Sequence, residues 1–299
     1  MQAPGAAARP AGAAGGAGIF DAEPGLMVDL LEGMIAAAIN AARFIRARSE
    51  DLASIEWHNK APSDFVSDVD TGAEARIHQM LSERPEWLPD DTKIHFLGEE
   101  SSPDAALGAG LTYVVDPLDG TTNFLHGYPW YAVSIGALLD GTLVAGVVLN
   151  AATDELFTAT LSGGAFRNGD QITVSSVGDP RRALVGTGFP FKYPEQIEPY
   201  LRQLPAVFRE TAGVRRAGSA ALDLADVACG RFDAFWELRL APWDVAAGLL
   251  LVREAGGFVT DLDGVDARVT TGPIVAGNPL MHRWLLETLR DESRVASGG

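Results

Sequence analysis

The chain has 299 residues, a formal net charge of −17 and a sequence pI near 4.6. Hydrophobic residues make up 47% and charged residues 21%, a composition typical of a globular protein that excludes a disordered or fibrous chain. So acidic a chain argues against broad binding to DNA or RNA, which needs clustered lysine and arginine. The single cysteine, Cys229, cannot form an internal disulfide and fits a reducing compartment, so we expect a cytoplasmic protein.

The two ends of the chain differ in composition from its body. Of the first 18 residues, 15 are Ala, Gly or Pro, so we expect residues 1–21 to be a disordered tail and residues 293–299 to be a flexible C-terminal tail. Residues 22–292 contain no linker and no repeat of fixed period, which favours one domain. No apolar run is long enough for us to expect a membrane span.

The hydrophobic period predicts the elements in chain order. Apolar residues recur at helical spacing from Met27 to Arg48, and a second helix is predicted from Thr71 to Arg84, where a proline stops it. A meander of short strands is predicted next, at Ile94–Leu97, Leu111–Val115, Tyr131–Leu139, Leu143–Leu149 and Glu155–Thr160. The second half alternates strands at Ala183–Thr187, Phe232–Glu237, Gly257–Leu262 and Pro273–Ala276 with helices at Glu195–Arg209, Ser219–Cys229, Asp244–Ala255 and Pro279–Arg290. This mixed order predicts an α/β layered fold.

The densest acidic cluster is D-P-L-D-G-T-T-N-F at residues 116–124, directly after a predicted strand. Its proline fixes one backbone angle and its glycine permits a positive φ, so the chain can turn and direct Asp116 and Asp119 toward one point. With the Leu118 carbonyl, these oxygens suit Mg²⁺, which prefers carboxylates, carbonyls and water to sulfur. Taken alone, the segment also fits an Asp-rich turn held by side-chain-to-backbone hydrogen bonds.

Two shorter acidic segments accompany this cluster. G-E-E at residues 98–100 follows one predicted strand, and Trp243-Asp244 opens an apolar helix. Taken singly, Glu99 is typical of a solvent-exposed acid in a loop. Asp244 is typical of an acid in the first turn of a helix, where the helix macrodipole favours negative charge.

Together, G-E-E at 98–100, the segment at 116–124 and W-D-V-A-A-G at 243–248 closely resemble the signatures of the inositol monophosphatase family. The resemblance covers roughly residues 27–290. It implies an α-β-α-β-α sandwich with a metal site between its halves, and one catalytic domain at residues 22–292. The implied activity is hydrolysis of a phosphate monoester that depends on Mg²⁺ and is sensitive to lithium.

The resemblance also implies a set of metal ligands. Glu99, Asp116 and the Leu118 carbonyl would hold a first Mg²⁺, and Asp116, Asp119 and Asp244 would hold a second. A third, weaker ion binds beside Glu99 in some members of the family. In such a site one cation activates water and the other stabilises the leaving oxygen.

A catalytic pair is implied in the same way. Lys60–Asp70 resembles the segment that precedes a helix in this family, and Asp70 matches the acid that hydrogen-bonds the catalytic threonine, here Thr121. We therefore expect Asp70 to orient Thr121, and Thr121 with Glu99 to activate the attacking water. Asp70 also stands where an N-cap of the predicted helix would be.

Substrate contacts are expected from two directions. Backbone N–H groups of Gly120, Thr121 and Thr122 would face the phosphate if a helix begins there. The resemblance implies that substrate hydroxyls meet Asp119, Ser219, Ala220 and Glu237.

Two positions bear on the choice of substrate. Thr122 stands where enzymes that act on adenosine bisphosphates, and many that act on histidinol phosphate, often have lysine. With Glu237, this favours a polyol phosphate such as myo-inositol 1-phosphate, with histidinol phosphate, fructose 1,6-bisphosphate and adenosine 3′,5′-bisphosphate as alternatives. Some bacterial relatives are also accessory factors of RNA polymerase or ribosome assembly. The resemblance implies a homodimer, and we expect neither direct nucleic-acid binding nor a membrane partner.

Overall fold

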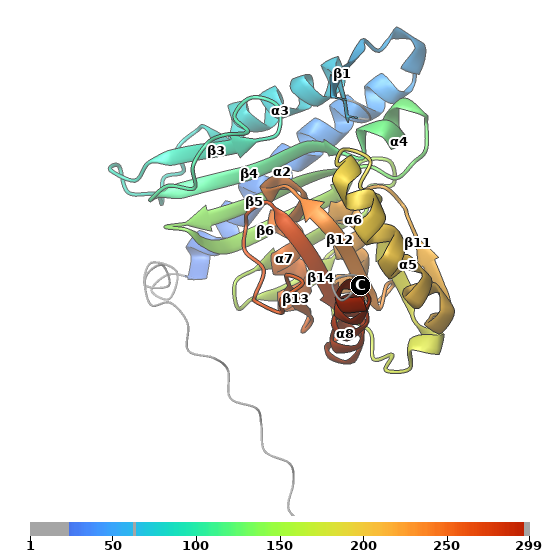
Figure 1. The fold of residues 1–299 in the computed structure, drawn as a ribbon. Coiled ribbons are helices and arrows are strands. Elements are labelled where there is room, and N and C mark those ends of the chain that lie inside the picture. The colour runs from blue at the N-terminus through green and yellow to red at the C-terminus, as the bar shows by residue number, and fades with distance from the viewer. Residues whose placement is uncertain (1–23, 62–63, 296–299) are drawn as a thin grey trace, which may run out of the picture.

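The computed structural model describes residues 24–61 and 64–295, with helices and strands labelled in Figure 1. The helices are α2 (Pro24–Ser49), α3 (Asp68–Leu81), α4 (Thr121–Leu125), α5 (Ile197–Glu210), α6 (Ala220–Ala228), α7 (Pro242–Glu254) and α8 (Pro279–Val295). A larger sheet contains β3 (Ile94–Gly98), β4 (Leu111–Asp119), β5 (Ala132–Leu139), β6 (Thr142–Asn150), β7 (Leu156–Thr160), β8 (Gly164–Arg167) and β9 (Asp170–Ile172). A smaller sheet contains β10 (Leu184–Thr187), β11 (Gly213–Arg215), β12 (Ala234–Leu240), β13 (Phe258–Thr260) and β14 (Gly272–Gly277), and β1 (Trp57–Ala61) pairs with β2 (Asp64–Ser67).

These elements stack in layers (Figure 1). The larger sheet has the order β3-β4-β5-β6-β7-β8-β9, and the smaller has the order β11-β10-β12-β14-β13. Helices α2 and α3 pack on one face of the larger sheet, α6 and α7 contact both sheets, and α8, with α5 packed on it, covers the remaining face of the smaller sheet. The predicted α-β-α-β-α sandwich is confirmed.

Three buried apolar clusters fill the spaces between these layers. All eight residues of β5 are buried, because α2 covers one face of this strand and α7 covers the other. A strand covered on both faces reads as a continuous apolar run rather than an alternating one, which is the pattern that the sequence has here. The central strands are therefore rigid supports for the loops at their ends.

Helix α2 differs from expectation in one respect. Its residues Gly25–Ser49 are long and apolar enough to cross a bilayer by length and composition, although a third of the most apolar window is buried. Leu30, Met34, Ala38 and Ile45 lie on one face and are at most 2% exposed, since this face packs against the larger sheet and α3. This packing is that of a core helix.

Every predicted helix and strand is present, with shifted ends. Helix α3 begins at Asp68 rather than Thr71, and β4 continues to Asp119 rather than ending at Val115. Helix α8 continues to Val295, so the expected C-terminal tail begins too early, at 293. The expected N-terminal tail lies outside the described residues.

The elements that the periodicity missed are short: β1, β2, β8, β9, β11 and α4. Strands β8 and β9 form a hairpin in which Arg167 pairs with Asp170. Its two turn residues, Asn168 and Gly169, both have positive φ, at 51° and 86°. An Asn-Gly dipeptide is a strong hairpin signal, and it could have been used here.

Candidate active site

Strand β4 carries both acids of the central motif. Asp116 pairs with Ser134 and Asp119 pairs with Ala132, so three steps along β4 oppose two steps along β5. Such a bulge matters because residues three apart in a regular strand point to opposite faces, whereas the extra residue brings Asp119 to the same side as Asp116. The two carboxylates therefore converge through a bulge in a strand, and not through the turn after a strand that we predicted.

The chain turns sharply after Asp119. Gly120 has φ 97° and ψ 33°, and a Cβ at this position would lie 2.9 Å from the Trp130 carbonyl oxygen, so both conformation and space require glycine. Helix α4 begins at the next residue, Thr121, which meets the condition that we set for backbone N–H groups to face a phosphate. The turn also brings the Thr121 hydroxyl within 3.1 Å of the Leu118 carbonyl.

Asp70 reaches Thr121 from α3. Its Oδ1 accepts a hydrogen bond of 2.8 Å from Thr121 Oγ1. Its Oδ2 accepts from the backbone N–H of Ser67 at 2.8 Å, while Ser67 Oγ accepts from Val69 N–H. Ser67 is therefore the N-cap of α3 and Asp70 is the third residue of a capping box, which corrects the alternative reading of Asp70 as the cap.

The second half of the chain contributes contacts to the same cluster. Ser219, the N-cap of α6, donates from Oγ to Asp119 Oδ2 at 2.7 Å, and the Ala221 N–H donates to the same oxygen at 2.7 Å. Asp244, in the first turn of α7, accepts from the Ala241 N–H at 2.6 Å. Glu99 follows β3, where its N–H donates to the Val115 carbonyl at 3.2 Å.

The carboxylates are close enough to repel one another. Burial raises the pKa of Asp116 well above its usual value, and the charges of Glu99, Asp119 and Asp244 raise it further. Burial also raises the pKa of Asp119 to about 6, against hydrogen bonds from Ser219 and Ala221 that lower it. Burial and then the charge of Asp119 raise the pKa of Asp244 to about 8. An added cation would relieve this repulsion.

Two cations face the cluster from the second half. The charge of Lys192 lowers the pKa of Asp119 and of Asp244, and the charge of Arg216 lowers the pKa of Glu237. The Arg216 guanidinium lies 5.5 Å from the Phe189 ring centre. These two positive charges partly offset the negative charge of the cluster.

The donor set fits Mg²⁺ in its chemistry, because it consists of carboxylates and one carbonyl, with no sulfur. In their present positions, however, no three acidic, histidine or cysteine side chains in the described part of the chain converge closely enough to hold an ion. Asp119 and Asp244 each point one oxygen toward protein donors instead. Side-chain rotamers change more easily than the backbone, and the backbone already places Asp116 and Asp119 on the same side of the strand.

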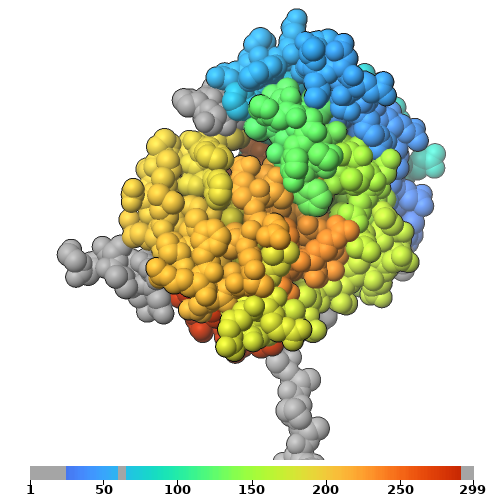
Figure 2. Space-filling view, turned by 90° about the vertical axis from the view of Figure 1, so that its right-hand side faces the viewer, coloured from blue at the N-terminus to red at the C-terminus, as the bar shows by residue number. Residues whose placement is uncertain are grey.

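The expected substrate residues are spread over the rim of the cluster. Thr122 is exposed at the start of α4, and Ala220 is the buried first residue of α6, where its neighbour Ala221 makes the polar contact. Glu237 lies on β12, where burial and then the charge of Asp244 raise its pKa to about 8. Figure 2 shows the face on which the green segment of α4 meets the yellow and orange segments of the second half. Asn123 joins them by donating to the Ala217 carbonyl at 2.9 Å.

Two buried acids that lie near the cluster were not predicted from the sequence. Glu74 lies four residues after Asp70 on α3, and Asp223 lies four residues after Ser219 on α6. Residues four apart share one helix face, so each spacing was a usable signal. Asp223 is 1% exposed, and its Oδ1 has no hydrogen-bond partner among the described residues. Burial and then the charge of Glu237 raise its pKa well above the usual value.

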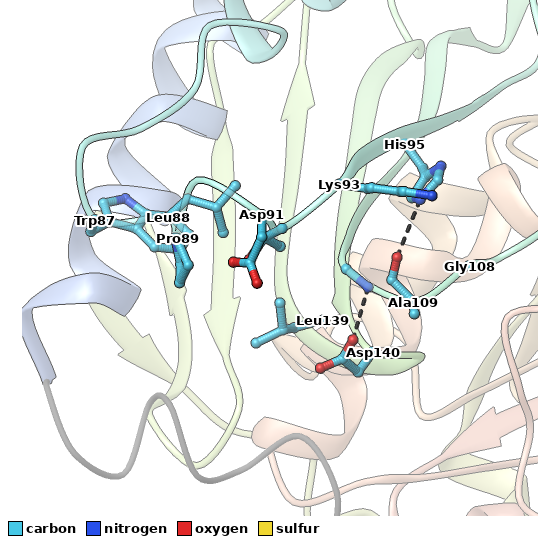
Figure 3. Close-up of a pocket in the computed structure, with 12 residues that line it drawn as sticks. Trp87, Leu88, Pro89, Asp91, Lys93, His95, Gly108, Ala109, Leu139 and Asp140 are labelled. Carbon is cyan, nitrogen blue, oxygen red and sulfur yellow. Dashed lines mark hydrogen bonds between the residues drawn. The ribbon is translucent and has the colours of Figure 1, made fainter.

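A cavity of about 470 Å³ lies elsewhere in the molecule (Figure 3). Its lining includes Leu139, Asp140 and His95, and Asp140 Oδ1 accepts from the Gly110 N–H at 2.8 Å. These residues lie at the end of the sheet where β4 begins. Asp119 lies at the other end of β4, about 26 Å away along the strand at a rise of ~3.3 Å for each residue. The cavity is therefore separate from the acidic cluster.

Known proteins resemble this chain over most of its length. The sequence model described as the inositol monophosphatase family matches residues 27–294. An inositol-1-monophosphatase of Mesorhizobium japonicum is 43% identical over 262 residues, which cover 87% of this chain and 96% of the relative. Nus factor SuhB of Escherichia coli K12 is 42% identical over 266 residues, which cover 89% of this chain and 97% of the relative. The crystal structure of the extragenic suppressor protein suhB from Bartonella henselae superposes with a TM-score of 0.80 at 42% identity, covering 87% of this chain and 98% of that one.

Proposed function

Because the chain belongs to the inositol monophosphatase family and is a phosphatase of that family, we propose that it hydrolyses a polyol phosphate, with myo-inositol 1-phosphate as the leading substrate. We include in the proposal a dependence on Mg²⁺, with two or three ions at each site. The reaction is attack of water on phosphorus, which breaks the phosphate ester bond and releases inorganic phosphate and an alcohol.

One observation carries the proposal. The Asp70–Thr121 pair lies beside a group of carboxylates that raise one another's pKa, Asp116 above all. A buried group of like charges without a cation is costly, whereas the same group is an efficient binding site for divalent metals. This combination of a positioned hydroxyl with a metal-binding cluster suits hydrolysis of an anionic ester.

The residues that would hold Mg²⁺ are the expected ones: Glu99, Asp116, the Leu118 carbonyl, Asp119 and Asp244. When bound, the ions would lower the pKa of water and neutralise charge that develops on the phosphate and the leaving oxygen. Rotation of Asp119 and Asp244 away from their present protein donors would free oxygens for this role.

The chain's own residues orient and deprotonate the water. Thr121 donates its hydroxyl hydrogen to Asp70, which leaves the Thr121 oxygen lone pairs free to accept a hydrogen from water. Glu99 provides a second acceptor. The proton that water loses thus goes to a carboxylate, either directly or through the threonine hydroxyl.

The rim residues would bind the rest of the substrate. Backbone N–H groups of Gly120, Thr121 and Thr122 would contact the phosphate at the start of α4. Substrate hydroxyls would contact Asp119, Ser219, Glu237 and the backbone at Ala220. Glu237 is half-buried between the cluster and the solvent, so it can accept hydrogen bonds from a polyol ring.

Phosphate release from four substrates tests the proposal: inositol 1-phosphate, fructose 1,6-bisphosphate, histidinol phosphate and adenosine 3′,5′-bisphosphate, each with Mg²⁺ and with a chelator. We expect inositol 1-phosphate to lead by tenfold or more in kcat/KM, which is about 1.4 kcal/mol of transition-state preference. A lead of that size for another substrate would contradict the polyol assignment and retain the metal chemistry. Activity that persists in chelator would contradict the metal chemistry.

The relatives named Nus factor SuhB favour a second candidate function, an accessory role through contacts with RNA polymerase. The two roles are separable, because catalysis needs the charge of the carboxylate cluster and a docking role needs only the outer surface of the domain. Pull-down of polymerase by the wild-type protein and by Asp119→Asn distinguishes them. Equal capture by both supports a role independent of catalysis, and no capture by either contradicts it.

Three further properties belong to the same proposal: a cytoplasmic location, a homodimer and inhibition by lithium. Lithium would compete for a Mg²⁺ position, so inhibition should weaken as Mg²⁺ is raised. Activity that is indifferent to millimolar lithium would count against the inositol phosphatase assignment.

A further inference from the structure

A buried acid on α3 holds the loop that carries Glu99. Glu74 is 4% exposed, and both of its carboxylate oxygens accept backbone hydrogen bonds from the turn after β3. Oε2 accepts from the Glu100 N–H at 2.9 Å, and Oε1 accepts from the Ser101 N–H at 2.8 Å. Hydrogen bonds to a carboxylate are roughly twice as strong as neutral ones, so this contact fixes the turn firmly.

The turn is built to admit this carboxylate. A Cβ at Gly98 would lie 2.7 Å from Glu74 Oε2 and 2.8 Å from its Cδ, so any side chain there would displace Glu74 or the turn. Ser102 fastens the same turn from its other end, since its Oγ accepts from the Gly98 N–H at 3.1 Å and donates to the Phe96 carbonyl at 3.1 Å. The backbone at Glu99 is thus held on both sides.

One face of α3 contacts both of the residues proposed to activate water, Thr121 through Asp70 and the turn that carries Glu99 through Glu74. Asp70 and Glu74 are one turn apart on α3, so their side chains leave the helix in nearly the same direction. Asp70 binds Thr121 after β4, and Glu74 binds the turn after β3. These strands are parallel neighbours, with Gly98 opposite Val115. Helix α3 therefore sets the position of Glu99 relative to Thr121.

We infer that Glu74 is a positioning residue, which holds the backbone of Glu99 so that its carboxylate can bind Mg²⁺. The inference rests on the proposed function, in which Glu99 is a metal ligand. Groups that orient a metal ligand without touching the ion typically contribute about 10- to 100-fold to metal affinity.

The test measures Mg²⁺ affinity by calorimetry without substrate, together with hydrogen exchange of the Glu100 and Ser101 amides in metal-free protein. In Glu74→Ala we expect exchange at these amides to accelerate, and the Kd for Mg²⁺ to rise by about tenfold or more. Glu74→Gln keeps one acceptor oxygen and should lie between Glu74→Ala and the wild type. Glu32→Gln, an exposed substitution on α2, is the matched control and should leave Mg²⁺ affinity unchanged.

Gly98→Ala provides an independent arm. In the wild-type background it should weaken Mg²⁺ binding, because the new methyl group meets the Glu74 carboxylate. In the Glu74→Ala background the carboxylate is absent, so adding Gly98→Ala should raise the Kd for Mg²⁺ by less than about twofold. All titrations are made well below the Tm of each variant, so that a loss of stability alone does not alter the affinity.

Mg²⁺ binding by the wild-type protein distinguishes a failure of the proposed function from a failure of the inference about Glu74. If wild-type protein binds no Mg²⁺, the proposed function fails and takes this inference with it. If the wild-type protein binds Mg²⁺, and folded Glu74→Ala binds it with a Kd within about twofold of the wild-type value, the inference about Glu74 fails and the proposed function stands.

Discussion

Asp70 and Thr121 are 51 positions apart in the chain, and a hydrogen bond of 2.8 Å joins Asp70 Oδ1 to Thr121 Oγ1. The other Asp70 oxygen completes the capping box of α3. A single buried side chain thus fixes both the start of a helix and the direction of the hydroxyl proposed to accept a proton from water. The two roles do not compete, because each uses a different oxygen.

Replacement of Thr121 tests its hydroxyl. Thr121→Val keeps the shape of the side chain and removes only the hydrogen-bonding group, so the fold should persist. We expect kcat to fall by about 10²- to 10⁴-fold, the usual contribution of a positioned acid–base group. Thr121→Ser retains the hydroxyl and is the matched control. Similar kcat values for the valine and serine variants would remove Thr121 from the mechanism.

Asp119→Asn should separate activity from stability. The amide oxygen can still accept from Ser219 Oγ and the Ala221 N–H, so the link between the two halves is kept. Loss of the negative charge relieves repulsion with Asp244, and we expect the metal-free Tm to stay level or rise.

Activity of this variant should fall by about two orders of magnitude or more, since several kcal/mol of charge stabilisation by the metal site are lost. Asp29→Asn, on the exposed part of α2, is the control for an acid-to-amide change. An unchanged kcat in Asp119→Asn would exclude Asp119 as a metal ligand.

The effect of Mg²⁺ on stability should grow with pH. Burial raises the pKa of Asp119 to about 6 and of Asp244 to about 8, from an ordinary 3.8, so the folded metal-free protein binds more protons than the unfolded chain over this range. The unfolding free energy therefore falls as pH rises. Below the ordinary pKa of 3.8, the contribution of these acids to the unfolding free energy is fully present. It is lost progressively as the pH rises to about 6 for Asp119 and to about 8 for Asp244.

Metal binding needs the deprotonated acids, so the gain in Tm on adding Mg²⁺ should increase between about pH 5.5 and pH 8. Thermal unfolding in chelator and in saturating Mg²⁺, across this range, measures the difference. A gain that is the same at every pH would contradict the coupling between these carboxylates and the metal.

Glu237 should affect the substrate and not the chemistry. Above the Glu237 pKa of about 8, this side chain is a charged hydrogen-bond acceptor, and Glu237→Gln replaces it by a neutral one. The loss of a charged hydrogen bond, measured at such a pH, corresponds to about 10- to 100-fold in kcat/KM for inositol 1-phosphate. Hydrolysis of p-nitrophenyl phosphate, which has no ring hydroxyls, should change little. An equal loss with both substrates would place Glu237 in the metal chemistry instead.

Local sequence predicted much of the fold because the dominant signals are local. The continuous apolar run of β5 and the periodic face of α2 can each be read from a single window of residues. The missed elements, such as α4 and β11, are three to five residues long. At this length a period cannot be recognised, and neighbouring elements decide the structure.

The sequence by itself determined which residues could carry the chemistry, because D-P-L-D-G-T, G-E-E and W-D fix the residue types and their order. It also determined that Gly120 would turn the chain. Only the tertiary structure decided that a bulge in β4 brings Asp119 to the side of Asp116, and that Ser219, a hundred residues away, reaches the same carboxylate. The spacing of Glu74 from Asp70 was a signal in the sequence, but only the structure showed its partners, which are backbone N–H groups of a loop 26 and 27 positions further on. Such contacts depend on how the layers stack, and backbone donors leave no trace in the side chains of the sequence.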